Sequence, residues 1–136
     1  MARKLLVTDD AMIIREMIKD IACAAGWEIA AEATNGQEAV ELYFQHRPDA
    51  MTLDLVMPEY DGLHALRGIL GSDPSAKIIV VSALDQTQVL NKAIQLGAVD
   101  FIVKPFDDDE LRETLDRIVP SSMMCDAPAG KSGEPY

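Results

Sequence analysis

The sequence predicts an α/β fold, a doubly wound five-stranded parallel sheet with helices on both faces. Short apolar runs rich in Val, Ile and Leu alternate along the chain with longer segments whose apolar residues recur every three or four positions. Most of the short runs are apolar on both faces, as expected for strands that helices cover on either side. The 136 residues, 49% of them hydrophobic, are enough for one core.

Each element follows from its own stretch of this pattern. In chain order, the predicted strands are Lys4–Thr8, Glu28–Ala33, Ala50–Leu53, Lys77–Val81 and Val99–Val103. Each strand is followed by a segment with an apolar stripe at helical spacing. In order, the stripes are Ile14, Met17, Ile18 and Ile21; Ala39, Val40, Tyr43 and Phe44; Leu63, Leu66, Ile69 and Leu70; Val89, Leu90, Ala93 and Ile94; and Leu111, Leu115, Ile118 and Val119.

Capping signals mark several helix ends. Gly26 and Gly97 follow the first and fourth helices, where a left-handed residue commonly ends a helix. At helix starts, an Asn or Asp three residues before a Glu or Gln can accept a hydrogen bond from the first turn. The pairs of this kind are Asn35 with Glu38, Asp85 with Gln88, and Asp107 with Glu110.

The periodicity ends near residue 119, so we expect one domain over residues 1–119. Residues 120–136 gain Pro, Ser and Gly, which predicts a flexible C-terminal tail or a truncated linker. A formal net charge of −11 disfavours binding to nucleic acid or to anionic membranes. The first apolar run is too short for a signal peptide or a membrane span, and the two cysteines predict no disulfide framework. We therefore expect a cytoplasmic protein.

Polar side chains follow the ends of four predicted strands. Asp9 and Asp10 follow the first strand, Asp54 the third, Ser82 the fourth and Lys104 the fifth. Functional crevices of open parallel sheets lie beyond the carboxyl ends of the strands, so we expect these side chains to converge. Converging carboxylates repel one another, and a bound cation removes this repulsion. The nearby ligands are all oxygens, which favours Mg²⁺, with Mn²⁺ or Ca²⁺ as alternatives.

This set of groups fits phosphoryl transfer. Lys104, Ser82 and the metal can neutralise the three oxygens of a transferring phosphoryl group. Asp54 is the best candidate for a nucleophile that forms an acyl phosphate, because it lies on the central strand. Each group also has a structural interpretation: Asp10 as the cap of the first helix, Asp54 in a turn, Ser82 as a loop hydroxyl and Lys104 in a surface bend.

Four motifs contain these residues: Val7-Thr8-Asp9-Asp10, Leu53-Asp54-Leu55-Val56-Met57-Pro58 with Asp61-Gly62, Val81-Ser82-Ala83, and Phe101-Ile102-Val103-Lys104-Pro105-Phe106. Together they resemble the receiver domains of two-component response regulators, most closely the free-standing chemotaxis type, CheY. The resemblance covers about residues 3–119 and implies a flavodoxin-like (CheY-like) sheet of strand order 2-1-3-4-5. Thr8 departs from the family pattern, which has an apolar residue there, and its hydroxyl needs a partner if it is buried.

The resemblance also implies a role for each site residue. Asp54 is the phosphoacceptor, Asp10 a direct metal ligand, Asp9 a ligand through water, and Val56 a ligand through its backbone carbonyl. Ser82 bonds one phosphoryl oxygen and Lys104 pairs with another. On phosphorylation, Ser82 moves inward and Phe101 follows, which remodels the face formed by the fourth helix, fifth strand and fifth helix. Ordinary core packing is the alternative interpretation of Phe101.

The implied partners are a histidine kinase, or a small phosphodonor, and a downstream protein on that face, such as the flagellar motor. We expect no metabolic turnover, and a monomer or a dimer that forms on phosphorylation. Three alternatives remain. The chain could be the N-terminal receiver of a longer regulator, a Mg²⁺-dependent aspartyl-phosphate phosphohydrolase, or a flavin- or nucleotide-binding module. The phosphohydrolase motif Asp-x-Asp is broken here by Val56, and two acids open the loop where a phosphate cradle would lie.

Overall fold

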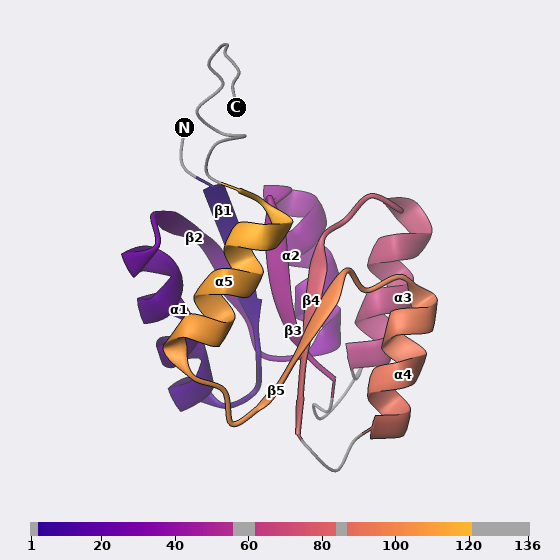
Figure 1. The fold of residues 1–136 in the computed structure, drawn as a ribbon. Coiled ribbons are helices and arrows are strands. Elements are labelled where there is room, and N and C mark those ends of the chain that lie inside the picture. The colour runs from indigo at the N-terminus through magenta and orange to yellow at the C-terminus, as the bar shows by residue number, and fades with distance from the viewer. Residues whose placement is uncertain (1–2, 56–61, 84–86, 121–136) are drawn as a thin grey trace, which may run out of the picture.

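The computed structural model describes residues 3–55, 62–83 and 87–120, which form five strands and five helices in alternation (Figure 1). The predicted strands are confirmed, with bounds that shift by one or two residues. The strands are β1 (Arg3–Thr8), β2 (Trp27–Ala33), β3 (Ala50–Asp54), β4 (Ile78–Ala83) and β5 (Asp100–Lys104). The helices are α1 (Met12–Ala24), α2 (Gly36–His46), α3 (Gly62–Ser72), α4 (Thr87–Leu96) and α5 (Asp108–Ile118).

All strand pairs are parallel, and the sheet order is β2-β1-β3-β4-β5, which confirms the order implied by the resemblance. Parallel pairing brings the carboxyl ends of the strands to one edge of the sheet. The register there pairs Thr8 with Leu53, Asp54 with Val81, and Ser82 with Val103. The residues that end β1, β3, β4 and β5 therefore lie along a single edge.

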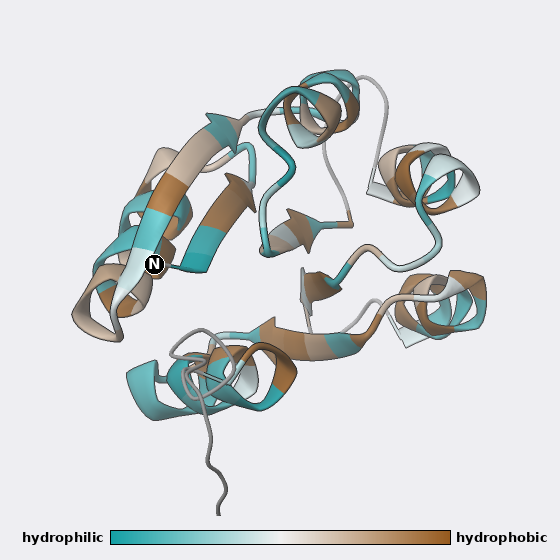
Figure 2. Ribbon diagram, turned by 90° about the horizontal axis from the view of Figure 1, so that it is seen from above, coloured by the Kyte–Doolittle hydropathy of each residue, from teal (hydrophilic) through white to brown (hydrophobic). Residues whose placement is uncertain are grey.

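Helices cover both faces of the sheet, and each layer closes its own core. Helices α1 and α5 pack on one face over residues such as Leu5, Val7 and Ile79. Helices α2, α3 and α4 pack on the other face over residues such as Leu6, Met51 and Val80. Figure 1 shows the two layers, and Figure 2 shows hydrophobic colour concentrated on the strands and on parts of the helices. Alternate residues of one strand thus serve opposite cores.

The predicted helix ends are confirmed wherever the structure describes them. The side chains of Asn35 and Asp107 accept hydrogen bonds of 2.9 and 2.8 Å from the backbone N–H groups of Glu38 and Glu110. Gly26 and Gly97 have φ values of 93° and 120°, in the region that favours glycine. The predicted Asp85 cap and the predicted tail over residues 121–136 lie outside the described residues.

Arg3 joins the amino end of β1 to the carboxyl ends of α1 and α5. Its side chain is 4% exposed, and its guanidinium donates to the carbonyl oxygens of Ala25, at 2.6 Å, and Val119, at 2.8 Å. It also forms a 3.0 Å ion pair with Asp116 and lies 4.7 Å from the centre of the Trp27 ring. Orphan carbonyls at two helix ends are thereby satisfied by one cation. Across the described ranges, no helix has the length and apolarity needed to cross a bilayer.

Candidate functional site

Three carboxylates converge at the carboxyl edge of the sheet, as the strand-end pattern predicts. Asp9 directly follows β1, Asp54 is the last residue of β3, and one oxygen from each of Asp9, Asp10 and Asp54 lies within 4.8 Å of the others. The side chains of Asp9 and Asp54 are only 1% and 7% exposed, whereas Asp10 is exposed. A donor set of carboxylate oxygens fits a hard cation such as Mg²⁺.

Lys104, the last residue of β5, lies between two of these carboxylates. Its ammonium nitrogen is 3.0 Å from Oδ2 of Asp9 and 3.6 Å from Oδ2 of Asp54. A buried carboxylate without a compensating charge is costly, so this cation stabilises the cluster. The same position lets Lys104 contact a group bound to Asp54.

Asp9 is held at every polar atom. Its backbone N–H donates to the carbonyl of Ala33 at 3.1 Å, and its own carbonyl accepts from Nη1 of Arg15 at 2.8 Å. Its Oδ1 accepts from the backbone N–H of Ala11 at 2.9 Å, and its Oδ2 accepts from Lys104. Hydrogen bonds therefore hold Asp9 in one position, whereas the exposed carboxylate of Asp10 is more accessible to a cation from solvent.

The structural interpretation of Asp10 as a helix cap is wrong. The N-cap of α1 is Ala11, and no side chain makes a capping hydrogen bond there. The first turn of α1 also has no acidic residue, although acids are favoured at this end of a helix. The carboxylate of Asp10 is thus not used to start the helix.

Ser82 and Phe101 are the two predicted switch residues. Ser82 is fully buried inside β4 and not in a loop, and its hydroxyl donates to the carbonyl of Ala83 at 3.4 Å. Phe101, in β5, is 45% exposed, so the interpretation of its ring as ordinary core packing is wrong. Ile94 and Val99, which precede Phe101 in the chain, are also exposed apolar residues. Val56 lies outside the described residues.

Gly62 supports the site in a way that sequence reasoning missed. It is the first residue of α3, and its N–H donates to the carbonyl of Leu55 at 3.1 Å. A Cβ atom at this position would lie 2.4 Å from the carbonyl oxygen of Asp54 and 2.5 Å from Cα of Leu55. The start of α3 therefore packs directly on the backbone that carries Asp54, which only a residue without a side chain permits.

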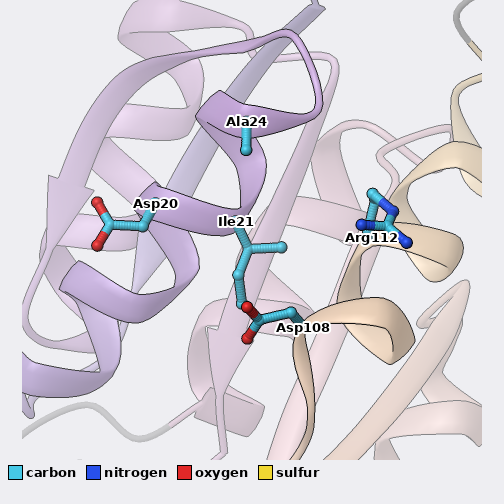
Figure 3. A pocket seen from close by; sticks show the side chains of 5 residues that line it. All are labelled: Asp20, Ile21, Ala24, Asp108 and Arg112. Atoms are coloured by element: carbon cyan, nitrogen blue, oxygen red, sulfur yellow. The ribbon is translucent and has the colours of Figure 1, made fainter.

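A pocket of about 160 Å³ lies between α1 and α5, lined by Asp20, Ile21, Ala24, Asp108 and Arg112 (Figure 3). It is smaller than the roughly 300–1,000 Å³ typical of small-molecule sites. None of its lining residues belongs to the carboxylate cluster. It is a separate feature of the α1–α5 layer.

Comparison with known proteins agrees with this geometry. The profile of the response regulator receiver domain matches residues 5–116. The chain is 48% identical over 118 residues to the chemotaxis protein CheY of Thermotoga maritima, an alignment that covers 87% of this chain and 98% of that protein. It is 52% identical over 114 residues to the chemotaxis protein CheY of Listeria monocytogenes, which covers 84% and 96%.

Solved structures give the same result. The receiver domain of AraT, a response regulator from Geobacillus stearothermophilus, superposes with a TM-score of 0.81 at 34% identity over 91% of this chain and 97% of that one. A CheX–CheY–BeF3–Mg²⁺ complex from Borrelia burgdorferi contains a chain with a TM-score of 0.81 at 32% identity, which covers 85% and 88%. The fold and the family are consistent across these comparisons.

Proposed function

Because the chain belongs to the response regulator receiver domain family, we propose that Asp54 accepts a phosphoryl group in a Mg²⁺-dependent reaction. The donor is a histidine kinase or a small phosphodonor. The observation that carries the proposal is the buried Asp54 beside Asp9 and Asp10, with Lys104 3.6 Å away. Residues 1–119 would form the receiver domain, with residues 120–136 as a tail or linker.

In the proposed reaction, an oxygen of Asp54 attacks the phosphorus atom, and the bond between phosphorus and the donor's leaving group breaks. Asp10 and the carbonyl of Val56 would hold Mg²⁺ directly, together with Asp54, and Asp9 through water. Bound Mg²⁺ supplies positive charge to the transferring oxygens. Lys104 pairs with one phosphoryl oxygen and Ser82 donates to another, so that the charge gained by Asp54 is neutralised.

The proposed output is a change on the face formed by α4, β5 and α5. Exposed apolar side chains on α4 and β5 and in the turn between them, Ile94, Phe101 and Val99, offer a surface for a protein partner. When phosphorylated Asp54 draws Ser82 inward, Phe101 follows and reshapes this surface. The relatives named chemotaxis protein CheY suggest a role in chemotaxis. We further propose the flagellar motor as the target, and a monomer or a dimer that phosphorylation favours. The same receiver chemistry would apply if the chain were the receiver of a longer regulator.

The test is intact-mass spectrometry after incubation with a small phosphodonor such as acetyl phosphate, with and without Mg²⁺. The wild type should gain one phosphoryl group only when Mg²⁺ is present, and Asp54→Ala should gain none. Asp20→Asn, which removes an exposed acid on α1 outside the cluster, should behave as the wild type. An adduct that survives in Asp54→Ala would refute the assignment of the nucleophile.

The phosphohydrolase alternative predicts a different result when a phosphorylated metabolite replaces acetyl phosphate. Such an enzyme would consume a phosphorylated metabolite over many turnovers, whereas a receiver should form at most one adduct per chain. Release of phosphate from such a metabolite far in excess of the protein, lost in Asp54→Ala, would favour the enzyme.

A further inference from the structure

We propose that Arg15 is a positioning residue that holds the Asp9 backbone in the geometry required for metal binding. The proposal rests on the proposed function, because it concerns the same carboxylate cluster. The observation is the hydrogen bond from Nη1 of Arg15 to the backbone carbonyl of Asp9, 2.8 Å long. It joins the first turn of α1 to the residue that connects β1 to the site.

Arg15 bridges three elements. It is the fourth residue of α1, its Nε donates to Oε1 of Glu32 in β2 at 3.0 Å, and its side chain is 13% exposed. Glu32 is itself fixed by Lys19, whose ammonium lies 2.8 Å from Oε2. The guanidinium is therefore held from one side by β2 while its other side binds Asp9. The planar guanidinium group of arginine, with several N–H donors in fixed directions, can bind Glu32 and Asp9 at once better than the single ammonium of lysine.

The positive charge of Arg15 allows an electrostatic role to be distinguished from a hydrogen-bonding role. A cation in the first turn of a helix is disfavoured by the helix dipole, and a cation near a Mg²⁺ site should repel the metal. If its charge were its main contribution, removal of Arg15 would therefore tighten metal binding. If its hydrogen bond to Asp9 matters more, removal would weaken metal binding instead. The two explanations predict changes of opposite sign.

Arg15 acts at a helix start that has no capping side chain. The loop from Asp9 to Ala11 is held by the Ala11 N–H to Asp9 Oδ1 bond, and Arg15 reaches back over this loop from the helix it begins. Groups that orient metal ligands are typically worth about 10- to 100-fold in metal affinity. We therefore expect Arg15→Met to weaken metal binding by about 10-fold.

The experiment measures the affinity of the metal-free protein for Mn²⁺ by water-proton relaxation. Arg15→Met is compared with the wild type, with Arg15→Lys, and with Lys19→Met, which removes the other partner of Glu32 without touching Asp9. Arg15→Met should lose about 10-fold, Arg15→Lys should recover only part of the loss, and Lys19→Met should bind as the wild type does. Equal or tighter binding by Arg15→Met would overturn the proposal, and so would an equal loss in Lys19→Met.

A second readout needs no metal. The Ala11 amide, which donates to Asp9, should exchange its hydrogen faster in Arg15→Met than in Lys19→Met when thermal melting shows that both variants are folded. Unchanged exchange would contradict the positioning role. If the wild type binds no Mn²⁺, or if Asp10→Asn binds it equally well, the metal site itself is wrong, whereas the exchange result still decides whether Arg15 holds Asp9.

Discussion

Replacing Gly62 with alanine tests whether the start of α3 presses on the backbone of Asp54. The added Cβ would lie 2.4 Å from the Asp54 carbonyl oxygen and 2.5 Å from Cα of Leu55. Comfortable separations are about 3.5–4 Å, so the backbone must move by roughly 1 Å. Both contacts are to backbone atoms, which cannot relieve a clash by changing a side-chain rotamer. Insertion of a methyl group into a tight core typically costs about 1–3 kcal/mol.

Helix α3 offers two matched controls. Gly71 has nothing within 4 Å of the position its Cβ would take, so Gly71→Ala should stabilise the protein by roughly 0.5–1 kcal/mol through helix propensity. At Gly68 the added Cβ would lie 3.3 Å from a methyl group of Val40, a tight contact that offsets the gain in helix propensity, so Gly68→Ala should be nearly neutral. Gly62→Ala should destabilise by about 2 kcal/mol, which leaves a spread of roughly 2.5–3 kcal/mol across one helix.

The assay is urea unfolding of the three variants and the wild type, followed by far-UV circular dichroism. With an m-value of about 1–3 kcal/mol per molar, the midpoints of Gly62→Ala and Gly71→Ala should differ by roughly 1–3 M. The rate of phosphorylation by acetyl phosphate should fall in Gly62→Ala alone, because the Asp54 carbonyl is displaced. Equal midpoints for Gly62→Ala and Gly71→Ala would refute the close packing on which this reasoning depends.

Two further predictions concern buried hydroxyls. Thr52 is fully buried, and its hydroxyl has no hydrogen-bond partner among the described residues, so Thr52→Val should raise the melting temperature by about 3–5 °C; a lower value would reveal an unseen partner. Burial and the hydrogen bond to Asp73 raise the pKa of Tyr43 to about 12. A raised pKa stabilises the fold below pH 10, and this contribution is lost as the pH rises towards about 12. The ultraviolet absorbance that the wild type gains over Tyr43→Phe should therefore titrate near pH 12 and not near 10.

The sheet, its helices and the meeting of the acids could be predicted because each depends on local patterns or on one topological rule. The caps at Asn35 and Asp107 require only a residue three positions away. The convergence of Asp9 with Asp54 requires only that parallel strands share a carboxyl edge. Both kinds of information are present in the order of residues along the chain.

The contacts that complete the site depend on side-chain reach across elements, which periodicity does not contain. No local pattern assigns Arg15 to the Asp9 carbonyl, or shows that Gly62 abuts the backbone of Asp54. The apolar stripe of α1 also misplaced one residue, because Met17 is 38% exposed whereas Ile18 is fully buried. Spacing fixes which residues share a helical face, but not where the sheet beneath that face ends.

The buried hydroxyl of Thr8 illustrates the same limit. The sequence indicated that a buried Thr8 would need a partner, yet the structure buries it, 1% exposed, with no hydrogen bond to the described residues. The local sequence pattern identified the cost of burying this hydroxyl, but not whether the surrounding core would supply a hydrogen-bond partner.

The Arg3 contacts have a consequence for synthesis of the chain. Arg3 leaves the ribosome well before its acceptor carbonyl at Val119, which lies 116 residues later in the chain. At about 5–20 residues per second, Val119 is synthesised roughly 6–23 s after Arg3. Until then the guanidinium at the amino end of β1 lacks its Val119 acceptor. The first strand therefore cannot complete its native hydrogen bonds before the last helix has been made.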